Sequence, residues 1–118
     1  MFTNLLLVAA GGAAGSVLRY LCQRSLNLSF PYGTLVVNLL GCFLIGLLMG
    51  FFARHDDEQR RLLLVTGICG GFTTFSSFAY EGVQMLNDQR WLSFVLYISI
   101  SVAVGLLATY AGYKLTSA

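Results

Sequence analysis

The chain has 118 residues, of which 57% are hydrophobic and only 10% charged, whereas a soluble domain carries roughly 25% charged residues. This composition excludes a soluble globular domain and indicates an integral membrane protein. About 20 apolar residues cross the hydrocarbon core, so the length allows about four spans and no separate soluble domain. We therefore expect one multi-pass, all-α membrane domain over residues 1–118, with lipid as its surroundings and no nucleic-acid partner.

The first predicted span covers residues 2–23 and is interpreted as a retained helix. A cleavable signal peptide begins with basic residues, but the first arginines here, Arg19 and Arg24, follow the apolar run. Glycines and alanines between residues 10 and 15 form a smooth face suited to close helix contact. A polar loop with the only proline, Pro31, precedes the second predicted span, residues 33–53.

The third predicted span, residues 62–85, contains an unusual run of glycines, hydroxyl residues and phenylalanines between residues 67 and 78. Gly70 and Gly71 lack Cβ atoms and weaken a helix, while Thr and Ser hydroxyls can bind the carbonyls that a broken helix leaves free. We expect a break near residues 70–75. Non-helical backbone persists in a bilayer only where protein buries it or where it lines a wet cavity, so the break indicates a binding or permeation site. The fourth predicted span covers residues 91–113.

Basic residues are almost balanced between the two sides of the membrane. With four spans the middle loop and both termini share one side, so the comparison is between Arg54, Arg60, Arg61 and Lys114 on that side and Arg19, Arg24 and Arg90 on the other. Since Lys and Arg set orientation, the chain could insert both ways up, and the alternative is a weak bias that still fixes one orientation. Four small helices hardly enclose a pore, so we expect a homo-oligomer in both cases.

Polar side chains inside the spans each have two interpretations. Arg19 either reaches the headgroups or donates hydrogen bonds into a vestibule. Asn38 either joins helices or lines a pore, and Thr34 lies one turn before it on the same surface. Tyr97 and Ser101, four residues apart, form a polar stripe that either binds its own helix carbonyls or faces an ion.

Three phenylalanines, Phe72, Phe75 and Phe78, recur beside the expected break at the spacing of an ordinary packing stripe. Aromatic rings also present a positive edge, which can attract a poorly hydrated anion in a narrow path. Glu81 is the only acidic residue in the predicted spans, and this scarcity of carboxylates disfavours proton relays and cation transport. Glu81 itself is either a solvated charge or faces a vestibule. The sequence lacks a Walker loop, a Ser/His/Asp set and a histidine cluster, so we expect no enzymatic activity.

Three motifs resemble the Fluc/CrcB family of fluoride channels: GGAAGSVLRY at residues 11–20, GTLVVNLLG at 33–41 and GICGGFTTFSSF at 67–78. The resemblance covers essentially the whole chain. It implies a channel of the bacterial inner membrane that exports fluoride passively and protects the cell from its toxicity. It also implies an antiparallel, dual-topology homodimer with two pores and a central structural sodium ion.

The resemblance assigns roles to individual residues. Phe75, Phe78 and Asn38 match the pore positions, and the backbone carbonyls of Gly70 and Thr73 match the sodium ligands. The remaining matches comprise the hydroxyl residues of the ion path, Thr74, Ser77, Tyr97 and Ser101, and the vestibule charges, Arg19 and Glu81. Thr34, which shares a surface with Asn38, is grouped with the pore residues. Relatives often carry another hydroxyl one turn beyond Ser101, where this chain has Gly105.

Two other classes of function are possible for a chain of this size. A small dual-topology exporter is expected to hold a carboxylate in its first helix for proton coupling, and residues 2–23 contain none. An accessory membrane subunit without transport would need only small-residue helix faces. The combination of Asn38 with Phe75 and Phe78 would then have no explanation.

Overall fold

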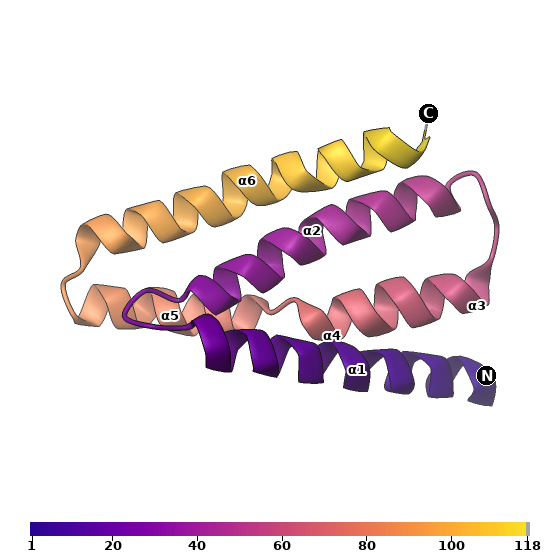
Figure 1. Cartoon of the computed structure of the whole chain (residues 1–118), viewed down its shortest axis with the longest axis horizontal. Coiled ribbons are helices and arrows are strands. Elements are labelled where there is room, and N and C mark those ends of the chain that lie inside the picture. The colour runs from indigo at the N-terminus through magenta and orange to yellow at the C-terminus, as the bar shows by residue number, and fades with distance from the viewer. Residues whose placement is uncertain (118) are drawn as a thin grey trace.

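The computed structural model describes residues 1–117, which form four antiparallel helical spans. The spans are α1 (Phe2–Leu26), α2 (Tyr32–Phe52), a composite third span, and α6 (Trp91–Ser117). The third span consists of α3 (Glu58–Arg61), the π-helical η1 (Leu62–Cys69), α4 (Gly70–Phe72) and α5 (Phe75–Asn87). Figure 1 shows that α1 begins and α6 ends on the same side of the bundle as the turn between α2 and α3.

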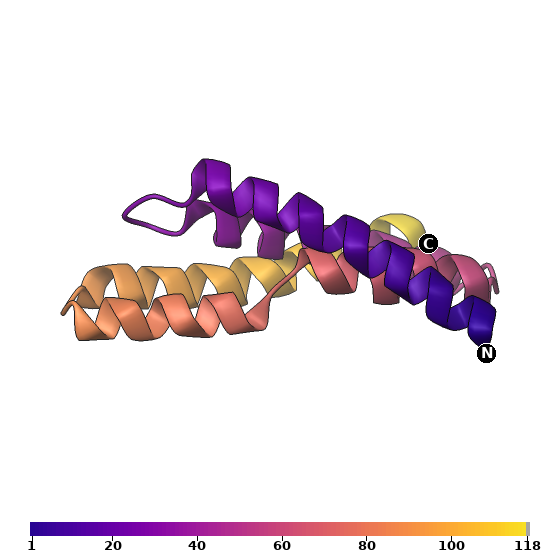
Figure 2. The same cartoon turned by 90° about the horizontal axis from the view of Figure 1, so that it is seen from below.

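All four spans are long and apolar enough to cross a membrane, judged by length and composition. One of them, the third, is bent between α4 and α5 (Figure 2). Many large apolar side chains on the outside, such as Leu92, Leu106 and Leu115, are exposed, which suits a surface in contact with lipid. The structure therefore confirms the predicted all-α membrane class with one bent span.

The bend lies at Thr73 and Thr74, whose backbones are extended with φ/ψ of −84°/158° and −150°/114°. The paired glycines just before them are helical. A Cβ on Gly71 would lie 2.5 Å from the carbonyl oxygen of Gly12, so its lack of a side chain lets α4 contact α1 directly. Gly15 is equally constrained, because its Cβ would overlap the backbone of Ile68. Gly71 and Gly15 therefore serve helix packing, and the threonines form the break.

The break changes the neighbour of the third span. Before it, η1 and α4 pack against α1, whereas α5 has α6 as its main neighbour. Figure 2 shows the chain crossing between these two positions as an extended segment. The break thereby places Phe78 beside Tyr97 of α6, while Phe75 lines a cavity next to α2.

Candidate ion-binding site at the helix break

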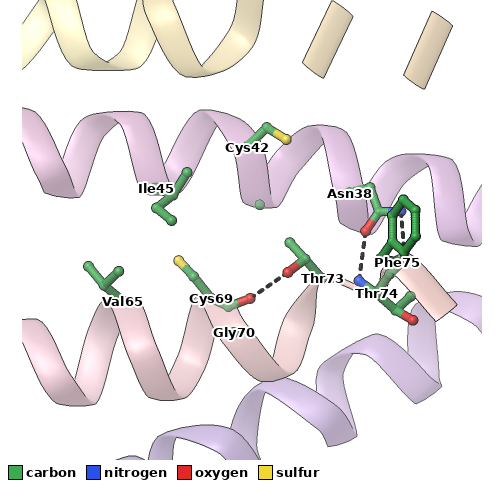
Figure 3. A pocket seen from close by; sticks show the side chains of 10 residues that line it. Asn38, Cys42, Ile45, Val65, Cys69, Gly70, Thr73, Thr74 and Phe75 are labelled. Atoms are coloured by element: carbon green, nitrogen blue, oxygen red, sulfur yellow. Dashed lines mark hydrogen bonds between the residues drawn. The ribbon is translucent and has the colours of Figure 1, made fainter. Parts of the chain in front are cut away.

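Asn38 of α2 binds both backbone groups of Thr74. Its Oδ1 accepts the Thr74 N–H at 2.8 Å, and its Nδ2 donates to the Thr74 carbonyl oxygen at 3.1 Å (Figure 3). Buried backbone groups need partners, and the extended backbone at Thr74 has no helical ones. Asn38 supplies them and so joins α2 to the third span. A carboxamide nitrogen has two hydrogens, and the other has no acceptor among residues 1–117.

Two backbone carbonyls at the break lose their helical partners. The Thr74 N–H points across to α2 instead of to the carbonyl of Gly70, four residues earlier. The Ser77 N–H binds Thr74 Oγ1 at 3.1 Å instead of the carbonyl of Thr73. By contrast, the Cys69 carbonyl accepts both the N–H and the hydroxyl of Thr73, at 3.0 and 2.9 Å. Within residues 1–117, the carbonyls of Gly70 and Thr73 accept no hydrogen bond.

These two residues line an open, mostly apolar cavity of about 310 Å³ between α2 and the third span. Figure 3 shows Asn38, Thr73, Thr74 and Phe75 gathered at one end of it. Its oxygen atoms come from backbone carbonyls, hydroxyls and one amide. Residues 1–117 contain no group of three or more His, Cys, Asp or Glu side chains able to hold a metal ion. A cation in this cavity would therefore be bound by neutral oxygens, the donor set of a hard ion.

Glu81 of α5 accepts hydrogen bonds from three side chains. Its Oε2 accepts from Thr34 Oγ1 at 2.9 Å and from Asn27 Nδ2 at 3.1 Å. Its Oε1 accepts from the Tyr97 hydroxyl at 2.9 Å. Thr34 and Tyr97 are completely buried. Among the described residues no basic side chain forms an ion pair with Glu81, so neutral donors alone hold this half-buried carboxylate.

Arg19 connects the Glu81 cluster to the break. Its Nε donates to the carbonyl oxygen of Gly71 at 3.1 Å, and its Nη1 donates to Gln23 Oε1 at 3.2 Å. Gln23 Nε2 in turn donates to Thr34 Oγ1 at 3.0 Å. The guanidinium therefore binds the end of α4 and the side chain of Gln23. Hydrogen bonds run without interruption from the end of α4 to the Glu81 carboxylate.

The rings of Phe75 and Phe78 lie between these two groups. Their centroids are 5.8 Å apart, and the Phe78 ring is 5.1 Å from that of Tyr97. Phe75 is 79% exposed and lines the cavity at the break. On α6, the buried Oγ of Ser101 has no hydrogen-bond partner among residues 1–117. Buried hydroxyls are rarely left unpaired, which distinguishes Ser101 from the other hydroxyl residues of the site.

The structure thus brings most of the predicted site residues into two connected groups, one at the break and one around Glu81. Ser77 belongs to the first through its backbone only, and Ser101 has no contact with either through a hydrogen bond. Sequence reasoning missed Gln23 and Asn27. The spacing of four between Arg19 and Gln23 was a usable signal for one contact, whereas nothing local indicated that Asn27 binds a carboxylate 54 residues away.

Four apolar spans, a helix broken within the membrane segment and polar groups gathered at the break define a small membrane protein of the channel or transporter class. A family model described as "CrcB-like protein, Camphor Resistance (CrcB)" matches residues 6–113. The chain belongs to this CrcB/FluC family, in agreement with its three motifs.

Curated relatives are similar to the chain over nearly its whole length. "Fluoride-specific ion channel FluC" of Flavobacterium psychrophilum is 45% identical over 111 residues, 89% of this chain and 90% of the relative. The protein of the same name from Leptospira interrogans serogroup Icterohaemorrhagiae serovar copenhageni is 48% identical over 115 residues, 92% and 91% of the two chains. "Fluoride-specific ion channel FluC 2" of Rhodococcus jostii is 48% identical over 116 residues, 97% and 99% of the two chains.

Proposed function

We propose that this protein is a fluoride-selective channel of the bacterial inner membrane that lets fluoride leave the cytoplasm passively. The observation that carries the proposal is the identity of 45% to 48% to bacterial relatives named fluoride-specific ion channels, over about nine-tenths or more of each chain. A passive exit is sufficient for an anion that accumulates as hydrogen fluoride enters and dissociates.

The pore runs beside the break, along α5 and α6. The ring edges of Phe75 and Phe78 offer fluoride a positive potential without a full charge. The second amide hydrogen of Asn38 and the hydroxyl of Ser101 are donors that no group of the described chain uses. By contrast, the hydroxyls of Thr34 and Tyr97 donate to Glu81 in this conformation. Fluoride is therefore offered a few weak, neutral donors, as rapid permeation requires.

The remaining predicted residues border this path. Thr74 and Ser77 shape the start of α5, where the Thr74 hydroxyl caps the helix by accepting the Ser77 N–H. Arg19 and Glu81 supply the charges of the vestibule and the pore end. Because Arg19 also binds the Gly71 carbonyl, its charge is held beside the break at a fixed place.

Two copies of the chain assemble as an antiparallel, dual-topology homodimer with two pores. The balanced distribution of basic residues permits both orientations, and the cavity beside Gly70 and Thr73 is open. The unpaired carbonyls of these two residues fit a structural sodium ion shared between the copies. When bound, this ion supplies positive potential near the pores.

Fluoride efflux from liposomes tests the proposal. We expect the reconstituted protein to release fluoride rapidly while chloride stays inside, as followed with ion-selective electrodes. Phe75→Ile keeps an apolar side chain but removes the ring, and it should greatly reduce fluoride efflux without dissociating the dimer. Phe2→Ile, at the exposed start of α1, is the matched control and should conduct normally. Absence of fluoride efflux from verified dimers would instead support an accessory subunit.

A further inference from the structure

Asn27, just beyond the end of α1, uses its side chain to join α1, α2 and α5. Its own N–H makes the last helical hydrogen bond of α1, to the Gln23 carbonyl oxygen at 2.9 Å, and its extended backbone, with ψ of 121°, ends the helix. Its Oδ1 accepts the N–H of Thr34, in the first turn of α2, at 3.1 Å. Its Nδ2 donates to Glu81 Oε2 at 3.1 Å and approaches Thr34 Oγ1 at 3.4 Å. One carboxamide therefore contacts three other groups from two elements.

Close packing at the corner between α1 and α2 orients this carboxamide. A Cβ on Gly33 would lie 2.6 Å from the Cys22 carbonyl oxygen and 2.8 Å from Asn27 Oδ1, so the start of α2 touches the end of α1. An isolated β-bridge between Asn27 and Pro31 closes the short loop. Because the backbone N–H of Thr34 holds Oδ1, the amide nitrogen on the other side must face Glu81.

We propose that Asn27 is a positioning residue for Glu81. By donating to Oε2, it holds the carboxylate where the same group also accepts from Thr34 and Tyr97. The inference rests on the proposed function, which places Glu81 at the end of the fluoride pore. Without Asn27, the Glu81 carboxylate has one hydrogen-bond donor fewer and is free to rotate. The hydroxyls of Thr34 and Tyr97 that bind it then lose their fixed orientation.

Mutation can distinguish the role of the Asn27 oxygen, which accepts from the Thr34 N–H, from that of its nitrogen, which donates to Glu81. Asn27→Asp keeps an oxygen for the Thr34 N–H but replaces the donor to Glu81 with a second carboxylate oxygen. Asn27→Ser also keeps a capping oxygen, on a side chain too short to span to Glu81. Asn87→Asp is the matched control, because Asn87 is an exposed residue on the same membrane side. A residue that only capped α2 would tolerate both changes at position 27.

The Glu81 carboxyl group can be observed alone, because the chain contains only two glutamates, Glu58 and Glu81. Glu58 is exposed at the start of α3, so it can be replaced by glutamine. In Glu58→Gln protein labelled with ¹³C-carboxyl glutamate, the ¹³C NMR spectrum then contains one side-chain carboxylate signal, that of Glu81. We expect Asn27→Asp and Asn27→Ser to shift this signal and Asn87→Asp to leave it unchanged. Fluoride efflux should fall roughly tenfold in Asn27→Asp, the effect of losing a hydrogen bond to a charged group.

An unchanged Glu81 signal in both Asn27 variants, or fluoride efflux at the wild-type rate in Asn27→Asp, would overturn the inference. If Asn27→Asp does not assemble, the milder Asn27→Ser decides the question by the same signal. A different result is expected if the protein is not a fluoride channel. In that case the wild-type protein releases no fluoride, while the Glu81 signal still responds to changes at position 27.

Discussion

Replacing Asn38 with leucine should destabilise the protein strongly, because it leaves two backbone groups at the break without hydrogen-bond partners. Leucine has a similar size but can neither donate nor accept. The Thr74 N–H and carbonyl, bound by Asn38 at 2.8 and 3.1 Å, would both lose their partner. Leaving a buried polar group unsatisfied costs about 1–3 kcal/mol, so the two together should lower the free energy of unfolding by about 2–6 kcal/mol.

The loss can be measured by denaturant unfolding of the protein in detergent, followed by the fluorescence of Trp91, the only tryptophan. Asn4→Leu is the control, since the Asn4 side chain makes no hydrogen bond within residues 1–117. Fluoride efflux should fall in parallel for Asn38→Leu and also for Asn38→Asp, which keeps the acceptor but cannot donate while ionised. If Asn38→Leu is as stable as the control, the assignment of Asn38 as the partner of the broken helix is wrong.

Two further predictions concern packing and the cation. Gly15→Ala should destabilise the protein by about 1–3 kcal/mol, because the new Cβ overlaps the backbone of Ile68. Gly12→Ala, whose Cβ meets nothing within 4 Å, should be neutral or stabilising in the same unfolding assay; equal effects would contradict the close contact of α1 with the third span. Sodium at 100 times its dissociation constant should stabilise the dimer by about 2.7 kcal/mol over N-methylglucamine, and identical unfolding in both salts would argue against a site at Gly70 and Thr73.

The four spans could be predicted because apolar length is a local property of the chain. The break was also predicted, near residues 70–75, and it lies at Thr73 and Thr74, but the residues that leave the helix could not be named from sequence. The paired glycines have weak intrinsic preference for a helix, yet Gly71 stays helical because it packs on Gly12. Thr74 leaves the helix where a side chain 36 residues away in sequence can bind its backbone. Long-range partners therefore override local propensity at this segment.

Individual side chains also show which roles the sequence predicts and which depend on long-range contacts. From sequence, Asn38 could join helices or line a pore; the structure shows that it joins them, and its role in the pore stays a prediction. Arg19 binds the end of α4, and its role in the vestibule stays a prediction. Asn27 had no recognisable motif, because its significance depends on Thr34 and Glu81, which only the folded chain brings within reach.

The sequence by itself determined the membrane class, the number of spans and membership of the family, because composition, apolar length and ordered motifs are all readable along one chain. Only the tertiary structure decided which residues form the break, which carbonyls it frees and which donors hold the Glu81 carboxylate. These features depend on hydrogen bonds and close contacts between different helices. In an apolar medium every polar group needs such a partner, and the partner is set by the packing of the helices rather than by neighbours in sequence.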